Sequence, residues 1–450
     1  MPKLICRIQE SPVAEGRPET FFLLAFTGFI DAANYAAFEK HLDDVYRKGG
    51  RFAAADLSNL HYINSTGISA LIRYFGLYTD RGGAFCLASV PKAVGLSMHL
   101  LGVTSLIPFL KDVPAAREHF RAVLEGRVPA RPEEAAPAPS EAGAKAGKPA
   151  PAGKKVPVRK APADLANSKV LLLYPLKGRF SRILRRRFSR QDGRFILLHD
   201  IKEALDRYDE LSPDLVVLDC RLDPKGEFVT RLKISKERSL TSVIKLYERS
   251  TDVEADVDFK IWENDYLVDP FELLELFSLT EAELRRVPKD RKVFQQQIHF
   301  EFRGNPANVD KANKLSDLII RQAVRDEDDR TALFAATKEA IDNGVVHGNH
   351  RSQDLTIDVN FLVDQHKITV IVEDQGKGFD YAYYLSRIDS REAFEKAKRK
   401  ILDEGHRGGL GILLMHKCCD RLEYSGTGNA VRLEKNIGPG KGQEEWKEAV

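Results

Sequence analysis

A segment rich in proline and alanine divides the chain and limits how it can fold. Eight of the 21 prolines in this 450-residue chain fall between Pro129 and Pro162, and alanine, glycine and lysine fill most of the other positions. Such a composition buries too little apolar surface to offset the entropy of ordering the backbone. We therefore expect residues 126–166 to be a disordered Ala/Pro/Lys linker, and residues 438–450 to be a frayed tail.

The overall composition is typical of a cytoplasmic globular protein. Hydrophobic residues make up 43% of the chain and charged residues 30%, which is ordinary for soluble domains. No apolar run approaches the roughly 20 residues that span a bilayer, and the N-terminus lacks the apolar core of a signal peptide. The formal net charge of +3 gives no reason to expect direct nucleic-acid binding. Five cysteines without CxxC spacing predict free thiols rather than a disulfide framework or a zinc site.

Residues 1–125 alternate between strand-like and helix-like patterns, which predicts a small α/β domain with helices packed on one sheet. Within it, Asn64, Ser65 and Thr66 stand where an apolar strand gives way to a helix. Small polar residues at such a position cap free N–H groups. One interpretation is therefore that these three residues only cap the helix. The other is that Ser65 accepts a phosphate, which would face the positive end of the helix.

Three stretches in this domain, "GFID", "DLSNLHYINSTGISALI" and "LLGVTSLIPF", resemble in order the signatures of STAS domains, the fold of anti-sigma factor antagonists. The resemblance implies that a partner kinase phosphorylates Ser65. The family usually has Asp at the position of Asn64. Asn keeps the shape and hydrogen-bonding capacity of Asp but drops its charge.

Residues 167–288 again alternate, with nearly continuous apolar strands that indicate a parallel sheet buried on both faces. The segment "PDLVVLD" resembles the third strand of response-regulator receiver domains, which implies a flavodoxin-like fold with Asp219 at the phosphoacceptor position. Tyr174 and Pro175 replace the acidic pair that would hold a cation, and Asp269 replaces the expected lysine. Phosphoryl transfer to Asp219 needs both the bound cation and the lysine. We therefore expect a pseudo-receiver that acts as a scaffold or docking surface.

Residues 289–437 hold the strongest candidate for a site. On a helical pattern, Glu339 and Asn343 are one turn apart and share a face, next to an apolar face that includes Leu333 and Ala336. An amide oxygen and a carboxylate so placed suit a metal–phosphate site. Further along, Asp374 ends a strand before Gly376 and Gly378. A glycine-rich run with Gly405, Gly408, Gly409 and Gly411 then leads into an apolar helix, whose N-terminus would bind an anion.

Together these stretches resemble the GHKL ATPase fold, an α/β sandwich in which we expect a mixed sheet. "EAIDNGVVHG" is most similar to the anti-sigma factor serine kinases. The resemblance implies the cofactors ATP and Mg²⁺ and assigns the following roles: Asn343 holds the metal, Glu339 is the general base, Asp374 binds adenine, and Gly376, Gly378, Gly409 and Gly411 shape the nucleotide pocket and its lid. The lid, residues 380–404, looks longer and more helical than is usual for the family.

These features predict a bacterial signalling protein of the partner-switching type. Its kinase domain would phosphorylate the serine of a STAS antagonist, either another protein or its own Ser65, because a linker of about 40 residues lets the two domains meet. The partners implied are a STAS-domain antagonist, a sigma factor or other target, a serine phosphatase, and a second copy of the chain. The alternative is a non-catalytic scaffold that binds ATP as a structural ligand. Glu339 argues against it, because a binding module needs no base.

Overall fold

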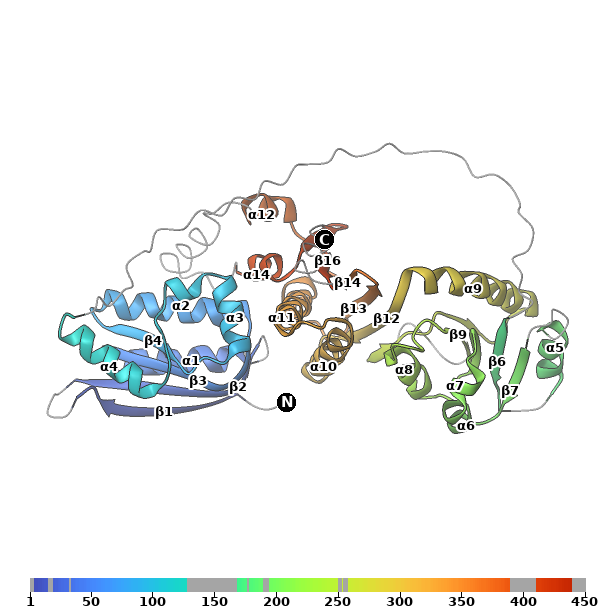
Figure 1. The fold of residues 1–450 in the computed structure, drawn as a ribbon, viewed down its shortest axis with the longest axis horizontal. Coiled ribbons are helices and arrows are strands. Elements are labelled where there is room, and N and C mark those ends of the chain that lie inside the picture. The colour runs from blue at the N-terminus through green and yellow to red at the C-terminus, as the bar shows by residue number, and fades with distance from the viewer. Residues whose placement is uncertain are drawn as a thin grey trace, which may run out of the picture.

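The computed structural model describes residues 4–14, 19–31, 34–127, 168–175, 178–188, 194–249, 253, 258–388 and 410–438. Almost all of the expected linker, the tail beyond residue 438, Gly405, Gly408, Gly409 and most of the expected lid lie outside these residues. Three domains lie in a row, with the C-terminal domain between the N-terminal and middle domains (Figure 1). Over the described ranges, no helix is long and apolar enough to cross a membrane.

The N-terminal domain has a five-stranded sheet in the order β1-β2-β3-β4-β5. Its strands are β1 (Ile5–Pro12), β2 (Thr20–Ile30), β3 (Phe52–Ile63), β4 (Ala84–Ala88) and β5 (Phe109–Leu110). Its helices are α1 (Tyr35–Arg47), α2 (Ser65–Asp80), α3 (Lys92–Leu100) and α4 (Val113–Leu124). Strands β2 to β5 pair in parallel, and β1 adds an antiparallel edge that the sequence pattern did not predict.

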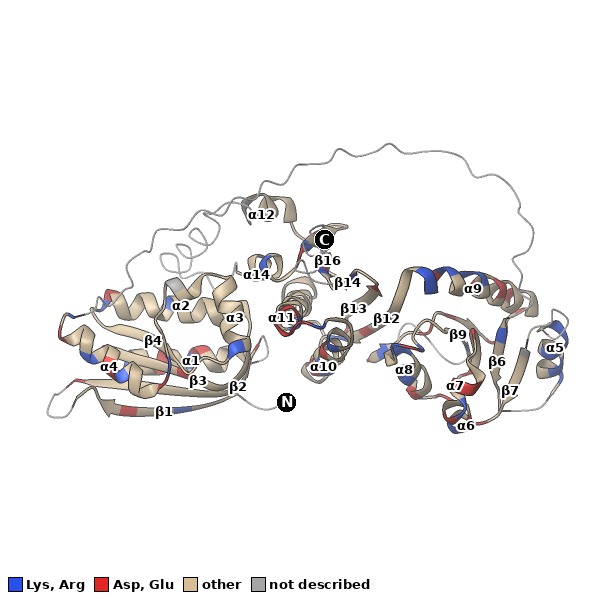
Figure 2. Ribbon diagram, viewed as in Figure 1, with Lys and Arg blue, Asp and Glu red and all other residues tan. Residues whose placement is uncertain are grey.

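The middle domain has a parallel sheet in the order β11-β9-β8-β6-β7. The strands are β6 (Lys169–Leu173), β7 (Arg194–Leu198), β8 (Leu215–Asp219), β9 (Ser242–Tyr247) and β11 (Asp265–Val268). The helices are α5 (Arg179–Phe188), α6 (Ile201–Asp206), α7 (Tyr208–Leu211), α8 (Glu227–Ile234) and α9 (Leu273–Val293). If the five strands are numbered 1 to 5 along the chain, the sheet has the flavodoxin-like order 2-1-3-4-5, as expected. Basic residues are concentrated on α5 (Figure 2).

The C-terminal domain has a six-stranded sheet in the order β10-β12-β13-β14-β16-β15. The strands are β10 (Phe259–Ile261), β12 (Phe294–Arg303), β13 (Thr356–Asp364), β14 (Lys367–Asp374), β15 (Arg421–Ser425) and β16 (Ala430–Asn436). The helical elements are α10 (Pro306–Ala323), α11 (Glu327–Asn343), the π-turn η4 (Gly344–Gly348), α12 (Tyr381–Ile388) and α14 (Gly411–Cys418). All pairings between its described strands are antiparallel, where we expected a mixed sheet. Two hairpins, β13–β14 and β15–β16, account for much of this, because short turns can join only antiparallel neighbours.

The middle and C-terminal domains are joined at two places. Strand β10, whose residues we expected in the middle domain, pairs with β12 at the edge of the C-terminal sheet, and Phe259 stacks 5.8 Å from both Phe300 and Phe302. Helix α9 passes through the boundary expected at residue 288 and leads directly into β12. In the described residues, β10 leads to β11 through three residues and α9 leads into β12 without a break.

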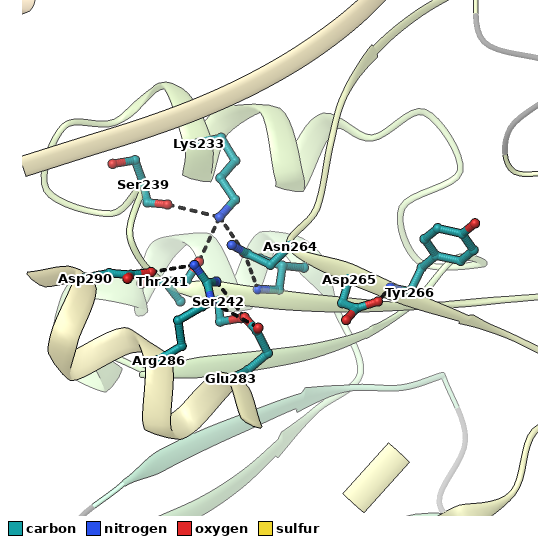
Figure 3. Close-up of polar contacts among 11 residues, drawn as sticks. Lys233, Ser239, Thr241, Ser242, Asn264, Asp265, Tyr266, Glu283, Arg286 and Asp290 are labelled. Atoms are coloured by element: carbon teal, nitrogen blue, oxygen red, sulfur yellow. Dashed lines mark hydrogen bonds and ion pairs between the residues drawn. The ribbon is translucent and has the colours of Figure 1, made fainter. Parts of the chain in front are cut away.

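A buried lysine fixes the three-residue connection between β10 and β11 (Figure 3). The Nζ of Lys233 on α8 donates to the carbonyls of Ser239 and Thr241, both at 3.0 Å, and to Asn264 Oδ1 at 2.6 Å. Asn264 Oδ1 also accepts a bond from the backbone N–H of Val243 at 2.8 Å. Burial lowers the pKa of Lys233 to about 7. Three oxygen acceptors satisfy the ammonium group, so this network attaches the connection firmly to the middle domain.

The N-terminal domain packs against the C-terminal domain through helices. Helix α3 lies along α11 and α14, and the N-terminal end of α2 approaches α14 (Figure 1). A single cluster of buried apolar side chains runs through both domains and includes Met98 of α3 and Leu414 of α14. The long linker between the domains in sequence therefore does not separate them in space.

Candidate functional site

Helix α11 carries the centre of the candidate site. It begins at the cap Asp326, whose side chain accepts a bond from the N–H of Asp329 at 2.8 Å. Leu333, Ala336 and Ala340, which the helical spacing placed on one apolar face, are buried. At its far end Glu339 and Asn343 line a cavity of about 390 Å³, and Asp374, Gly378 and Gly411 line the same cavity. Five of the residues singled out in the C-terminal sequence therefore come together.

Asp374 sits at the end of β14, where glycines allow the chain to approach it closely. Its Oδ1 accepts a bond from the N–H of Gly376 at 2.8 Å. A Cβ added to Gly348 would lie 2.2 Å from Asp374 Cγ, and one on Gly376 would lie 2.3 Å from the Gly348 carbonyl oxygen. Burial raises the pKa of Asp374, and the Gly376 N–H opposes this rise. Both glycines are thus required by this geometry, and they leave the carboxyl group facing the cavity.

The N-terminus of α14 reaches the cavity beside Glu339. A Cβ on Gly411, the first residue of this helix, would lie 2.4 Å from Glu339 Oε1 and 3.4 Å from Asn343 Nδ2. Backbone N–H groups and the positive end of a helix favour an anion such as a phosphate. Glycine at position 411 therefore keeps open the space between this helix end and the two polar side chains.

The N-terminal domain contributes Ser65 and Thr66 to the same cavity. The Ser65 hydroxyl donates a hydrogen bond of 2.5 Å to Glu339 Oε1, and the Ser65 N–H donates one of 3.2 Å to Oε2. Ser65 is only 5% exposed and Glu339 only 3% exposed. Burial raises the pKa of Glu339, while the bonds from Ser65 lower it. A carboxylate with a raised pKa at this distance can accept the proton of the hydroxyl group.

Asn64 leaves the Ser65 hydroxyl free for this contact. Asn64 is the N-cap of α2, and its Oδ1 accepts a bond from the N–H of Gly67 at 2.9 Å. A Cβ on Gly67 would lie 2.7 Å from the side chains of Ile30 and Ile63, so the first turn of α2 sits close against the strand ends. The capping role considered for this stretch thus belongs to Asn64, and Ser65 points out of the domain.

Two charged residues of α11 that we did not single out also meet the N-terminal domain. The Nζ of Lys338 lies 3.6 Å from the ring centroid of Tyr62 and 3.8 Å from Asp31 Oδ2, and burial lowers its pKa. Asp342 is buried, which raises its pKa to about 7. The signal for both was available in "KEAID": charged residues flank Glu339 on an otherwise apolar stretch of helix.

Aromatic residues of the C-terminal domain close another side of the cavity, and the sequence analysis did not identify them. Phe379, Tyr384 and Tyr424 line it. The ring centroids of Phe379 and Tyr424 are 5.2 Å apart, and those of Phe379 and Tyr384 are 5.6 Å apart. Stacked or edge-on rings of this kind offer an apolar surface to a flat base.

The Asp219 carboxylate in the middle domain is already bound by a cation. Arg221 donates to it from Nε at 2.8 Å, from Nη2 at 2.7 Å and from its backbone N–H at 3.0 Å. Within the described residues, no group of three or more His, Cys, Asp or Glu side chains could hold a metal ion. The guanidinium group of Arg221 therefore engages both carboxylate oxygens of Asp219.

Comparisons with protein families agree with this architecture. Residues 302–435 match the family described as histidine kinase-like ATPase domain, and residues 11–116 match the STAS domain. The chain thus joins a STAS domain and a histidine kinase-like ATPase domain, with a receiver-like domain between them in sequence.

Individual relatives match parts of the chain. The chain is 27% identical over 125 residues to the serine-protein kinase RsbW of Staphylococcus aureus (strain MSSA476), covering 27% of this chain and 75% of that protein. It is 35% identical over 91 residues to the transcriptional regulatory protein CpxR of Escherichia coli (strain K12), covering 20% of this chain and 38% of that protein. Among solved structures, an anti-sigma factor antagonist from Mycobacterium paratuberculosis matches with 19% identity and a TM-score of 0.24, over 27% of this chain and 97% of that one.

Proposed function

We propose that the C-terminal domain binds Mg·ATP and phosphorylates Ser65 of the N-terminal domain, in a partner switch that controls the sequestration of a sigma factor or another target. The observation that carries this proposal is the hydrogen bond between the Ser65 hydroxyl and Glu339, in a cavity that also holds Asn343 and Asp374. Similarity to a serine-protein kinase over 125 residues supports the same assignment.

The residues present fit a magnesium-bound nucleotide. The Asn343 side chain offers an amide oxygen of the kind that Mg²⁺ accepts as a ligand, and Asp374 offers an acceptor for an exocyclic amine. The helix end at Gly411 offers N–H groups to phosphate oxygens, in a space that a Cβ would fill. The bound nucleotide would supply the phosphoryl group, with its charge neutralised by the metal ion.

The chain's own residues then perform the transfer. Glu339 Oε1 accepts the proton of the Ser65 hydroxyl as the Ser65 oxygen forms a bond to the terminal phosphorus. The bond from that phosphorus to the bridging oxygen breaks, and ADP leaves with the electron pair. Because Ser65 and Glu339 are already in hydrogen-bond contact, docking of the two domains provides the required orientation.

The product would separate the domains. Phosphoserine carries a charge of about −1.5 to −2 near neutral pH. At position 65 it would stand against Glu339, next to the buried Asp342. Repulsion between these groups would release the N-terminal domain and uncover the faces of α11 and α14 that it now occupies, leaving them available to a target.

The test uses the full chain incubated with labelled ATP and Mg²⁺, with the modified site located by mass spectrometry. We expect label on Ser65, lost in Ser65→Ala and reduced at least about hundredfold in Glu339→Gln, the general-base range. Mixing the Glu339→Gln chain with the Ser65→Ala chain separates transfer within one chain from transfer between two. Tight nucleotide binding with no phosphate on Ser65 in any of these reactions would refute the kinase assignment and favour the scaffold.

A further inference from the structure

Lys338 of α11 points its ammonium group at two rings and a carboxylate of the N-terminal domain. Its Nζ lies 3.6 Å from the ring centroid of Tyr62, 5.3 Å from that of Phe29 and 3.8 Å from Asp31 Oδ2. Phe29 of β2 and Tyr62 of β3 are neighbours in the parallel register, and Asp31 directly follows the end of β2. The carboxyl ends of two adjacent strands therefore supply all three groups.

This contact leaves the ammonium group little access to water. Lys338 is 4% exposed, and Tyr62 is 7% exposed. A buried charge is costly unless an opposite charge or an aromatic face compensates for the lost water. A docked domain with an aliphatic side chain at position 62, or with no acid at position 31, would bury the Lys338 charge without that compensation. The lysine therefore disfavours such a domain, which is one way in which a buried charge confers specificity.

The contact lies next to the groups of the proposed phosphoryl transfer. Tyr62 precedes Ser65 by three residues, and Lys338 directly precedes Glu339. The Ser65 hydroxyl and Glu339 Oε1 are 2.5 Å apart. Neither Lys338 nor Tyr62 is among the described residues that line the cavity, so the pair would act by positioning the serine and not by catalysis.

We propose that Lys338 is a specificity-determining residue that selects the STAS domain on which this kinase acts. The substrate class is a STAS domain with an aromatic ring three residues before the acceptor serine and a carboxylate at the end of the neighbouring strand. The chain's own N-terminal domain, or that of a second copy, meets both requirements through Tyr62 and Asp31. This inference rests on the proposed function, because it names the substrate class of the same site.

A double-mutant cycle on the full chain tests the pair. It compares wild type, Tyr62→Leu, Lys338→Met and the double variant, and Tyr62→Phe is the conservative variant. The Tyr62 hydroxyl has no hydrogen-bond partner among the described residues, so Tyr62→Phe keeps the ring and breaks no hydrogen bond there. Two readouts are taken: the rate of phosphate transfer to Ser65, and hydrogen-exchange protection of α11 without nucleotide. Protection of β4 reports whether the N-terminal domain stays folded.

We expect Tyr62→Leu to lose at least about thirtyfold in both readouts, because it removes the ring and leaves the buried ammonium group uncompensated. In the Lys338→Met chain the same substitution should cost less than about threefold, since no charge is left there to compensate. Tyr62→Phe should retain most of the wild-type phosphorylation. Asp31→Asn provides a second cycle with Lys338→Met. It should cost about tenfold in the wild-type background and less than about twofold in the Lys338→Met background.

Equal losses from Tyr62→Leu in the two backgrounds would overturn the inference, and so would a loss in Tyr62→Phe as large as that in Tyr62→Leu. If β4 loses protection in Tyr62→Leu, the Asp31→Asn cycle decides in its place by the same criterion. The exchange readout separates this inference from the kinase assignment. If no variant carries phosphate but protection shows the coupling, the kinase assignment fails while selection by Lys338 stands. If wild type is phosphorylated and the coupling is absent, only selection by Lys338 fails.

Discussion

The buried carboxyl group of Asp342 should make docking of the N-terminal domain depend on pH. Burial, together with the nearby Glu339 and Asp31, raises its pKa from 3.8 to about 7, and Lys338 and Asn64 oppose the rise. The docked state therefore holds a proton that an exposed Asp releases near pH 4. The stabilisation of the docked state by this proton is complete at low pH and is lost as the pH rises through 7. From pH 8 to pH 6 it should stabilise docking by about 1.4 kcal/mol, or roughly tenfold.

Hydrogen exchange of α11 in the full chain measures this effect locally. Global unfolding would hide it, because Lys233 in the middle domain has a pKa lowered to about 7. The pH dependence due to Lys233 has the opposite sign. Its contribution to the stability of the middle domain falls as the pH drops through 7. After correction for intrinsic exchange rates, protection of residues 335–343 should be about tenfold higher at pH 6 than at pH 8. Asp342→Asn should remove most of this difference, and parallel pH profiles in the two chains would refute the reasoning.

Three further substitutions test other contacts. Gly411→Ala should cut Ser65 phosphorylation at least about tenfold, because the new Cβ would lie 2.4 Å from Glu339 Oε1 and displace that side chain. Unchanged phosphorylation would show that the N-terminal end of α14 is less crowded than this distance implies. Lys338→Met keeps the aliphatic stem but removes the ammonium group from the ring of Tyr62, and should weaken docking by about 1–2 kcal/mol in the same exchange assay. Equal protection in Lys338→Met and wild type would contradict this. Asn264→Ala takes a buried acceptor from Lys233 and should lower the thermal stability of the middle domain by about 1–3 kcal/mol, whereas an unchanged melting profile would argue against the network.

The sequence predicted the chemistry of each domain better than the contacts between domains. Glu339 and Asn343 were recognisable because helical spacing places them on one face, and Gly411 because it opens an apolar helix. The bond between Ser65 and Glu339 joins residues 274 positions apart. Periodicity shows that a helix face is buried but not what buries it, so the choice between the chain's own serine and that of another protein stayed open.

Short or interrupted elements were also beyond sequence reasoning. Strand β10 is three residues long, too short to show an alternating pattern. Pro288 looked like the end of a helix, yet α9 continues past it to Val293. Proline removes one backbone donor and disfavours a helix interior, but packing on the middle domain outweighs this local preference. Both features fall at the domain boundary, which is where the expected and observed divisions of the chain differ.

The position of β10 has a consequence for how this protein can be cut or recombined. A fragment beginning at residue 289 would lack the outermost strand of its sheet, so Phe300 and Phe302 would lose the covering ring of Phe259. The bare edge of β12 would then invite pairing with other chains and aggregation. An expression fragment should therefore start upstream of β6. Likewise, gene fusion could carry the C-terminal module to a new protein only together with the middle domain, or with a replacement strand.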